Sequence, residues 1–553
     1  MSFLRKIKCR VRNFFIVGKI KIYLNMAIYP NNKKIINNFN KHNKKIFTKK
    51  KGKKTKIFLL EFNGWPIVHI IFSYLVNYFK NEKSCKIVAY ESFNILNRVS
   101  PPWYNKYIWQ LGSIIVLKTF KVFKNFGTDQ FIKPKYSIKI LSESSKITEK
   151  FFLTNPNLQN LENLKIKGIW IGDLIYDSYL KKNLVGTVDI KSSNFKVFFK
   201  ESINFFLFWN DFFLKNKVEA ICVCHSVYLT GIPLRIANHK NVSCFSLSNM
   251  NLVNLSKSIS HQKKINGTDI HFRFYRNNFN KLTKKLQNKF LTKGKTFLND
   301  LIAGRKKYFY LKNKTYSNKI VDIKKYSKNN NRIKVVIFSH DFIDSPHMHG
   351  NHFFSDFKEW FKYLDTVIKK TNYDWFIKEH PASSDITKKE IKDLIKNNKN
   401  LKLIKKNFPN DQINKIGIKF VLTVYGSVAS ELPALGINVI NASKNNPHYG
   451  YNFCINPKNL THYKSILLNL DKVKNKINLR DLYLYNSMKY HRLKKNFFFG
   501  NNEKYFNFKN GKPLQYTFKM YDYWIKDFNL EKHKNIKENL KKFIESKKYF
   551  SFT

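Results

Sequence analysis

Short apolar runs alternate with amphipathic stretches along most of this chain. Residues 56–61 (KIFLLE) and 85–90 (CKIVAY) are apolar runs of strand length, and the segment between them opens at Pro66 with apolar residues at helical spacing. One face of that helix is expected to hold Val68, Phe72, Leu75 and Phe79, and the other His69, Ser73, Asn77 and Lys80. The order strand, helix, strand predicts a parallel crossover.

The same order recurs further along the chain. Residues 218–248 contain a strand, a polar break at His225 and Ser226, a short helix and the strand VSCFSL. After a Lys- and Asn-rich stretch, further strands are expected in RIKVVIFSH, YDWFIKEHP, IKFVLTVYGS and INVINA, and two helices are expected from about residue 515. This alternation predicts an α/β protein with parallel sheets covered by helices on both faces.

The length of 553 residues predicts more than one domain, because single hydrophobic cores usually stop growing at a smaller size. We expect a basic N-terminal arm (1–55), a first Rossmann-like domain (56–330), a second Rossmann-like domain (331–500) and C-terminal helices (501–553). Six cysteines without CxxC spacing fit a reducing cytoplasm. We find no segment that reaches the ~20 apolar residues of a membrane span.

The chain carries a net charge of +66, which favours nucleic acid, anionic lipid or an anionic substrate as partner. Lys, Asn, Ile and Phe are abundant together, so an AT-rich coding bias explains part of this charge. Residues 1–60 contain no Asp or Glu, and 41–56 contains nine lysines. Such an arm is either a solvated flexible segment or a segment that rests on an anionic membrane surface.

Open parallel sheets bind ligands outside the carboxyl ends of their strands, so the residues just past each expected strand are candidate site residues. Those in the first domain are Glu61, Asp173, Asp177 and His225. The second domain offers His340, Asp344 and His347 in one loop, with Lys378, His380 and Pro381 in the next. A histidine here can donate to a phosphate oxygen, a lysine adds positive charge, and the proline stiffens the turn.

The segment TVYGSVASELPALG supplies a third loop in the second domain. Gly426 and Ser427 break a strand, and a short helix is expected from there to Leu435. Backbone N–H groups at a helix start, with the Ser427 hydroxyl, suit a phosphate, and Glu431 one turn later can accept the hydroxyls of a ribose. The alternative is that Ser427 only caps the helix.

Four segments in this order, GIWIGDLIYDSYL, FSHDFIDSPH, DWFIKEHP and YGSVASELPALG, resemble proteins of bacterial capsular and surface polysaccharide biosynthesis over about 165–445. The resemblance implies a GT-B glycosyltransferase whose two Rossmann-like domains have parallel sheets facing a central cleft. Residues 56–330 would bind a glycan or lipid-linked acceptor, and 331–500 a nucleotide sugar.

By similarity to bacterial sialyltransferases and capsular Kdo transferases, His380 and Ser427 would hold the donor phosphate. No cofactor is implied beyond the nucleotide sugar as co-substrate, with a CMP-linked sugar as one candidate. The chain departs from several sialyltransferases in having no Asp-Asp-Gly or Glu-Asp-Gly triplet to supply the general base. Among Asp173, Glu61 and Asp177 we favour Asp173 as the base, because it ends an apolar stretch inside the region of resemblance.

His347, His349, His352 and Asp344 form a cluster that could ligate a metal, but their spacing matches no familiar zinc pattern, and we expect no metal site. Two alternative functions remain open. A polyol-phosphate transferase of the CDP-glycerol type would use the same His and Ser. A basic nucleic-acid-binding protein is disfavoured, because the lysines are spread along the chain and no nucleic-acid-binding motif is present. We expect a cytoplasmic protein at the inner face of the membrane, with no nucleic-acid partner.

Overall fold

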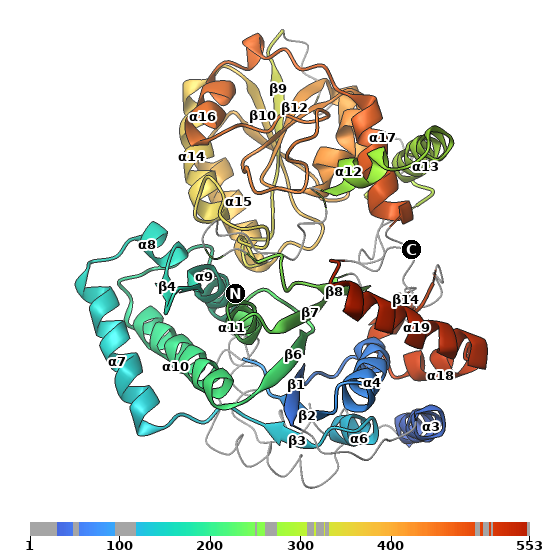
Figure 1. Cartoon of the computed structure of the whole chain (residues 1–553). Coiled ribbons are helices and arrows are strands. Elements are labelled where there is room, and N and C mark those ends of the chain that lie inside the picture. Colours follow the sequence, from blue (N-terminus) through green and yellow to red (C-terminus); the bar gives the residue numbers. More distant parts are fainter. Residues whose placement is uncertain are drawn as a thin grey trace. The chain divides into compact units, whose positions relative to one another are not determined.

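The structure is a computed structural model. It describes residues 30–47, 55–93, 118–248, 251–259, 261, 272, 274–306, 315–316, 326, 331–492, 498–500, 508–509 and 512–549. The described residues fold into two compact units (Figure 1). Unit 1 draws on Met1–Asn155, Ser193–Ile259 and Asn496–Thr553, and unit 2 on Pro156–Ser192 and Ser260–Lys495.

Unit 1 is built on a six-stranded sheet in which β8 alone runs antiparallel to its neighbour. In spatial order the strands are β3 (Gln130–Ile132), β2 (Cys85–Tyr90), β1 (Lys56–Glu61), β6 (Val218–Val223), β7 (Ser243–Ser248) and β8 (Asn251–Asn254). The strands predicted from residues 56–61, 85–90 and 218–248 are therefore confirmed.

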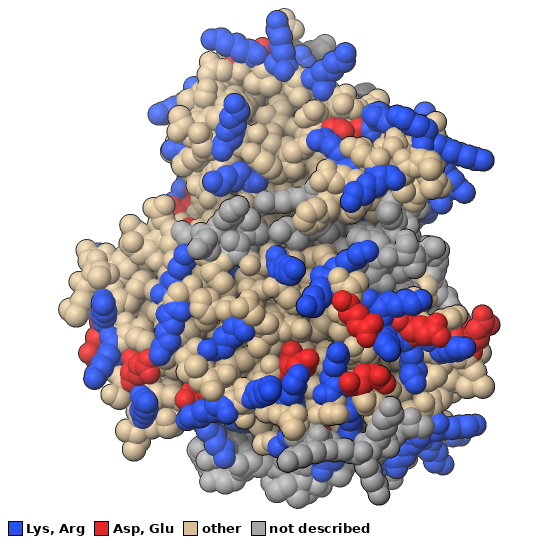
Figure 2. Space-filling view, in the orientation of Figure 1, with Lys and Arg blue, Asp and Glu red and all other residues tan. Residues whose placement is uncertain are grey.

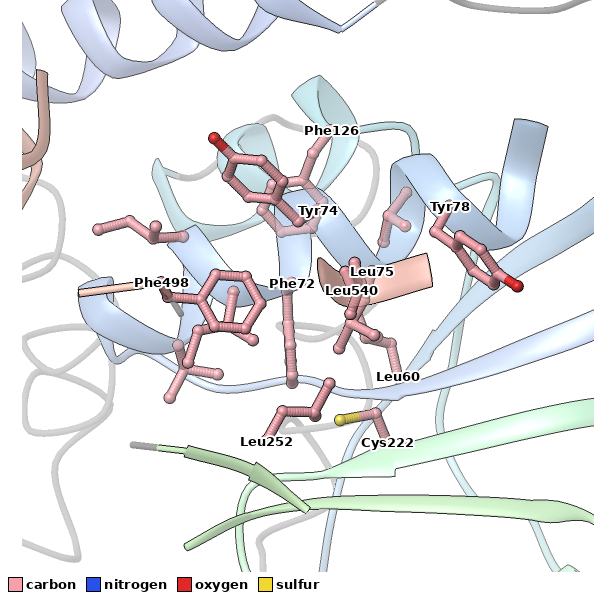
Figure 3. Close-up of a cluster of buried hydrophobic side chains, with 14 of the residues drawn as sticks. Leu60, Phe72, Tyr74, Leu75, Tyr78, Phe126, Cys222, Leu252, Phe498 and Leu540 are labelled. Atoms are coloured by element: carbon pink, nitrogen blue, oxygen red, sulfur yellow. The ribbon is translucent and has the colours of Figure 1, made fainter. Parts of the chain in front are cut away.

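Helices cover both faces of this sheet, because alternate strand residues point to opposite sides. Leu60 and Cys222 lie in a core that Phe72 and Leu540 help to fill (Figure 3). The helices on that side are α3 (Pro30–Ile46), α4 (Pro66–Asn81), α6 (Lys118–Asn125), α18 (Lys519–Lys526) and α19 (Leu530–Ser546). The other side holds α7 (Ile138–Leu153), α10 (Ser193–Lys215) and α11 (Ile232–His239).

Helix α4 begins at Pro66 as predicted, and both of its predicted faces are largely buried. His69 and Ser73, on the face that carries the polar residues, are buried. The reason is that α18 and α19 also pack on α4. The side chain of His69 lies 2.5 Å from the Tyr521 hydroxyl through Nδ1 and 2.8 Å from the carbonyl oxygen of Asn63 through Nε2.

The sequence left two alternatives for the N-terminal arm, a solvated flexible segment or a segment that rests on an anionic membrane surface, and the first is wrong for Pro30–Ile46. This segment forms α3, in which Ile36 and Phe39 are buried against unit 1. The ring of Phe39 stacks on that of Tyr521, with 4.1 Å between centroids. Exposed lysines of this helix include Lys34, Lys41, Lys44 and Lys45. Residues 1–29 and 48–54 lie outside the described residues.

Unit 2 is built on a five-stranded, all-parallel sheet. In spatial order the strands are β11 (Leu401–Ile404), β10 (Asp374–Lys378), β9 (Lys334–Phe338), β12 (Ile418–Thr423) and β13 (Asn438–Asn441). Val335 and Ile337 pack on one side, and Val336 and Phe376 on the other. The predicted α/β class, with two parallel sheets each covered on both faces, is confirmed.

Figure 1 shows α14, α15 and α16 on one side of this sheet and α12, α13 and α17 on the other. Their bounds are α12 (Tyr275–Asn280), α13 (Lys284–Ile302), α14 (Phe357–Lys370), α15 (Asp385–Asn397), α16 (Leu460–Leu468) and α17 (Leu479–Ser487). Close packing of α13 on α17 requires Gly294, since a Cβ there would lie 2.1 Å from the carbonyl oxygen of Tyr483.

The two units divide the chain differently from the predicted ranges. Residues 274–306, expected in the first domain, pack on the second sheet as α12 and α13, because their apolar faces join the core of unit 2. The segment 156–192 also belongs to unit 2 and forms α8 (Leu158–Glu162), β4 (Lys165–Ile166), β5 (Ile169–Trp170) and α9 (Gly172–Asn183). The predicted C-terminal helices α18 and α19 exist, and they belong to unit 1, as does the hairpin of β14 (Phe508–Lys509) and β15 (Lys512–Pro513).

Basic side chains are scattered over the face of each unit seen in Figure 2 and are interspersed with acidic ones. The cysteines that the structure describes, which are Cys85, Cys222, Cys224, Cys244 and Cys454, are all buried and unbridged. Within the described part of the chain, no helix combines the length and the apolar character that crossing a membrane requires.

Candidate functional site

The carboxyl edge of the unit 2 sheet brings three of the predicted loops together. The chain runs from β9 to β10 and β11 on one side, then crosses to β12 and β13 on the other side of β9. Ligands of open α/β sheets bind at such a reversal, here between β9 and β12. His340 follows β9, His380 follows β10 and Ser427 follows β12, so all three belong to this edge.

His340 joins the ends of β9 and β12 through hydrogen bonds. Its Nε2 lies 3.1 Å from the backbone N of Val424, which donates to it, and 3.0 Å from the Thr423 hydroxyl. Its ring stacks on Phe357. Burial, followed by the nearby His380 and His349, lowers the pKa of His340 to about 3. His340 was expected to contact phosphate or acceptor, but the structure shows a neutral side chain whose Nε2 already accepts from the protein.

His380 presents a different arrangement. The backbone N of Ala382 donates to His380 Nδ1 at 3.2 Å, and the backbone N of His380 donates to the Ser339 hydroxyl at 3.0 Å. Because Nδ1 accepts, the neutral ring carries its proton on Nε2. Burial lowers the pKa of His380 and favours this neutral form. Among the described residues, no acceptor for the Nε2 proton is found within hydrogen-bond distance, so the edge offers an N–H donor.

The loop that carries His380 is held rigidly. Asp341 Oδ1 accepts from the Ser384 backbone N and hydroxyl and from the Thr387 hydroxyl, at 2.5 to 3.1 Å, which fixes the start of α15. Lys378 is buried, and its Nζ donates to the carbonyl oxygen of Lys406 at 3.2 Å. Burial lowers the pKa of Lys378 to about 8. Its ammonium is therefore committed to this carbonyl, while Pro381 is half-buried at the edge.

The helix predicted from Ser427 to Leu435 is wrong. Two short 3₁₀ helices, η5 (Ser427–Ser430) and η6 (Leu432–Leu435), replace it, because Pro433 removes a helical N–H donor. Gly426 precedes η5, and no side chain caps that helix, so the alternative that Ser427 is an N-cap is also wrong. Gly426 donates its N–H to the Thr423 hydroxyl at 3.1 Å, and a Cβ there would lie 2.6 Å from the same oxygen.

Glu431 is buried between the two 3₁₀ helices and accepts a hydrogen bond from the Tyr316 hydroxyl. Burial and the neighbouring carboxylate hold the pKa of Tyr316 well above its ordinary value. Glu431 was predicted to bind a ribose. In the structure its carboxylate holds Tyr316, a residue about 115 positions earlier.

Asp173 and Asp177 were expected at the end of a main-sheet strand in the first domain, and this is wrong. Both lie on α9 in unit 2, after the separate antiparallel hairpin of β4 and β5. Gly172 starts this helix because its backbone approaches that of α8, and a Cβ there would lie 1.9 Å from the carbonyl oxygen of Leu161. Asp173 is buried in the first turn.

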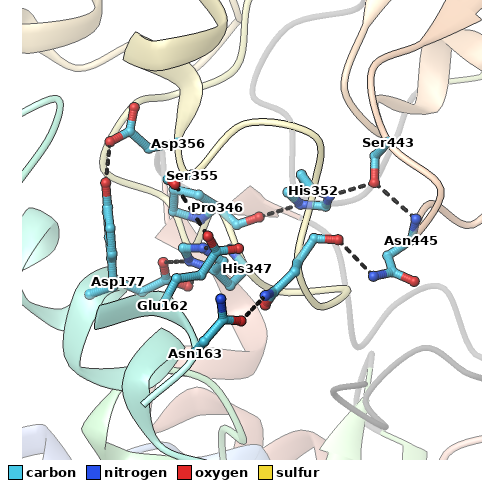
Figure 4. A network of polar contacts seen from close by, with 12 residues as sticks. Glu162, Asn163, Asp177, Pro346, His347, His352, Ser355, Asp356, Ser443 and Asn445 are labelled. Carbon is cyan, nitrogen blue, oxygen red and sulfur yellow. Dashed lines mark hydrogen bonds and ion pairs between the residues drawn. The ribbon is translucent and has the colours of Figure 1, made fainter. Parts of the chain in front are cut away.

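Asp177 forms a buried ion pair with His347 (Figure 4). The His347 Nδ1 lies 2.6 Å from Asp177 Oδ1, and the His347 backbone N donates to Oδ2 at 3.1 Å. On the other side of the ring, Nε2 lies 3.5 Å from Glu162 Oε1, an ion-pair distance without hydrogen-bond geometry. Burial alone would lower the pKa of His347, but the two carboxylates outweigh it and raise the pKa well above its ordinary value.

Further polar contacts tie 156–192 to the loop after β9. The Tyr176 hydroxyl donates to Asp356 Oδ2 at 2.5 Å, and the Ser355 hydroxyl donates to Glu162 Oε2 at 3.2 Å (Figure 4). His352 lies 2.5 Å from both the Ser443 hydroxyl and the Pro346 carbonyl oxygen. The loop histidines His347 and His352 are therefore structural. Sequence reasoning missed Glu162, Tyr176 and Asp356, because nothing local marks contacts across about 180 positions.

No group of three or more His, Cys, Asp or Glu side chains suited to a metal ion occurs among the described residues. Asp344 is the exposed member of the predicted cluster, and its carboxylate lies 3.7 Å from the ammonium of Lys181.

Unit 1 places Glu61 at the corresponding edge of its own sheet. Glu61 ends β1, and the reversal of strand order in this sheet lies between β1 and β6. Its Oε2 accepts from the backbone N of Cys224, just past β6, at 2.6 Å. Burial raises the pKa of Glu61 to about 7, against the opposing effect of that N–H. His225 follows Cys224 and is exposed.

No protein-family model and no curated protein matches the chain. Solved structures with some similarity include KpsC, a beta Kdo 2,4 transferase of Thermosulfurimonas dismutans (12% identity, 49% of this chain and 79% of that chain, TM-score 0.30). The UDP-GlcNAc 2-epimerase of Neisseria meningitidis, bound to UDP-GlcNAc, is 10% identical (86% and 100%, TM-score 0.20). A glycosyltransferase of Rickettsia africae is 11% identical (89% and 99%, TM-score 0.23).

Proposed function

We propose that the protein is a glycosyltransferase of surface or capsular polysaccharide biosynthesis, which transfers a sugar from a nucleotide sugar to a growing glycan or a lipid-linked acceptor. The observation that carries this proposal is the neutral His380, whose Nε2–H donor lies at the carboxyl edge of a parallel sheet. A donor fixed in orientation before the ligand arrives costs little reorganisation on binding.

Unit 2 binds the donor in this proposal. His380 Nε2 donates to a phosphate oxygen of the nucleotide sugar, and the half-buried Ser427 adds its hydroxyl from the loop after β12. Lys378, at the end of β10, donates to the carbonyl oxygen of Lys406 and so joins this strand to the segment that follows β11. A CMP-linked sugar is one candidate donor, and the nucleotide sugar is the co-substrate, with no resident metal.

Unit 1 binds the acceptor and supplies the general base, for which we now favour Glu61 over Asp173 and Asp177. Asp173 and Asp177 both lie on α9, which belongs to unit 2, and Asp177 is already paired with His347. Glu61 lies at the strand-order reversal of unit 1, and its pKa of about 7 suits a base that works near neutral pH.

A nucleotide panel tests the proposal. A ligand at 100 times its dissociation constant stabilises the folded protein by about 2.7 kcal/mol, which corresponds to a rise in melting temperature of about 5 to 10 °C for a unit of this size. We expect one nucleotide, or its sugar conjugate, to stabilise the wild-type chain in this way. If no nucleotide raises the melting temperature, the proposed donor site is wrong.

We also propose that the protein works at the inner face of the cytoplasmic membrane, where the basic residues before α3 contact anionic lipid. Deleting residues 1–29 removes these basic residues and keeps α3, and circular dichroism checks that the truncated chain folds. Sedimentation with vesicles of anionic lipid at low salt should fall on this deletion. Equal sedimentation of the two chains would refute the membrane contact.

A further inference from the structure

An exposed pair of aromatic side chains lies on unit 1, beside the turn that follows β1. Trp65 is 39% exposed and Tyr516 is 42% exposed, and their ring centroids are 5.5 Å apart at an angle of 56° (tilted). The two rings come from segments about 450 positions apart, since Tyr516 lies in the 3₁₀ helix η10 (Leu514–Tyr516), which packs on α4. Single exposed apolar residues are common on proteins, but two large rings in contact form a patch.

Local structure gives no reason for a tryptophan at position 65. Trp65 is the N-cap residue of α4, where Ser, Thr, Asp or Asn satisfies a free N–H of the helix, and its side chain makes no capping hydrogen bond. The Trp65 ring is not buried in the core, and it does not cap the start of the helix. A residue that departs from the local preference, and whose packing on Tyr516 leaves both rings exposed, points to a contact outside the chain.

The turn that presents Trp65 is rigid. Asn63 spans it, since its Oδ1 accepts from the Trp65 backbone N at 2.9 Å and its Nδ2 donates to the Glu61 carbonyl oxygen at 3.3 Å. The neutral His69, a buried residue of α4, donates through Nε2 to the Asn63 carbonyl oxygen, and its Nδ1 accepts from the Tyr521 hydroxyl of α18. The exposed ring is therefore preorganised, and so is its position relative to Glu61 at the end of β1.

We propose that Trp65 and Tyr516 form a carbohydrate subsite, on which a pyranose ring of the acceptor glycan stacks, next to Glu61. This inference rests on the proposed function and identifies the acceptor side of the same reaction. A pyranose has an apolar C–H face that packs on an aromatic ring, while its hydroxyls stay at the rim, within reach of polar groups. A pair of rings suits one or two sugar units, whereas a stable protein partner needs about 800 Å² on each side.

The test is a glycan array of neutral hexose, N-acetylhexosamine and uronic acid oligosaccharides, followed by calorimetric titration of the oligosaccharide that binds best. The proteins are the wild type, Trp65→Ala, Tyr516→Ala and the control Tyr136→Ala. Tyr136 is also in unit 1 and is 37% exposed, and its ring lies near that of Phe208, with 6.5 Å between the ring centroids. Circular dichroism verifies folding, and Tyr516→Ala serves as the second variant if Trp65→Ala fails to fold.

We expect Trp65→Ala to weaken glycan binding by about 30-fold and Tyr516→Ala by at least about 5-fold, as for aromatic residues that dominate an interface, with Tyr136→Ala unchanged. Nucleotide affinity should be unchanged in all three variants. Equal glycan binding by the wild type and Trp65→Ala would overturn the subsite. A wild type that binds a nucleotide but no glycan would also overturn it, while leaving the donor site intact. A wild type that binds neither would remove the proposed function as well.

Discussion

The buried pair of Asp177 and His347 allows a quantitative prediction about stability and pH. Both side chains are almost fully buried, 2.6 Å apart, and a second carboxylate, that of Glu162, lies 3.5 Å from the other ring nitrogen. Asp177→Asn keeps the shape of the side chain and removes its charge. The pair joins α9 to the loop after β9, so the substitution should destabilise unit 2.

The size of the loss follows from the burial. Removing one partner of a buried ion pair typically costs about 3 to 5 kcal/mol, because the remaining charge is left without compensation. For a unit of this size, each kcal/mol lowers the melting temperature by about 2 to 4 °C. We therefore expect Asp177→Asn to lower the melting temperature of unit 2 by about 6 to 20 °C near pH 6.5.

The loss should also depend on pH. The carboxylates raise the pKa of folded His347, so above pH 6.5 the unfolded chain releases a proton that the folded chain keeps. The stability that the pair contributes is therefore fully present below pH 6.5 and is lost as the pH rises through the folded pKa, by up to about 1.4 kcal/mol per pH unit. The difference in free energy of unfolding between the wild type and Asp177→Asn should therefore decrease as the pH rises above 6.5.

Denaturant unfolding at pH 6.5, 7.5 and 8.5 measures this difference. Asp300→Asn is the matched control, since Asp300 is an Asp of unit 2 whose carboxylate pairs at the surface with Arg305 and Lys306. Its effect should be small at every pH in this range. An Asp177→Asn loss that is equally large at all three pH values would refute the charged state that we assign to His347.

Three further predictions concern single positions. Glu61→Gln should lower turnover by about 10²- to 10⁴-fold in a transfer assay with nucleotide affinity unchanged, and full turnover would exclude Glu61 as the base. Gly172→Ala should lower the free energy of unfolding by about 1 to 3 kcal/mol in a denaturant titration, since the new Cβ would lie 1.9 Å from the Leu161 carbonyl oxygen, and an unchanged free energy of unfolding would show that α8 can move aside. Burial lowers the pKa of His69 to about 4, so its contribution to the free energy of unfolding should be lost as the pH falls from 6.5 towards 4, by about 3 kcal/mol. In denaturant unfolding over this pH range, the free energy of unfolding of His69→Gln should therefore change less with pH than that of the wild type.

The strands could be predicted because their signal is local. Runs such as residues 56–61 and 374–378 are apolar, have strand length and end in polar residues, and the structure has β1 and β10 at these positions. The helix start at Pro66 was predicted for the same reason. The placement of His380 at a carboxyl edge followed from these strands, without knowledge of their spatial order.

The errors arise where distant segments meet. The burial of the polar face of α4 could not be predicted, because it depends on α18 and α19, which lie about 450 positions later and cover His69. Asp177 looked like a strand-end residue because its buried partner, His347, lies 170 positions away. The segment from Ser427 to Leu435 contains a proline that sequence reasoning underweighted, and its two 3₁₀ turns take the place of a helix.

The central claim is that the carboxyl edge of the unit 2 sheet binds the phosphate of a nucleotide sugar through His380. Calorimetric titration of the best-binding nucleotide into wild type, His380→Ala and His462→Ala tests it most directly. His462 is a matched control, because it is exposed in the same unit and its Nδ1 also accepts a backbone N–H, that of Lys458, at 3.2 Å. A hydrogen bond to a charged group contributes about 1.5 to 3 kcal/mol, so His380→Ala should weaken binding by about 10- to 150-fold while His462→Ala leaves it unchanged. Wild-type affinity in a folded His380→Ala protein would contradict the account.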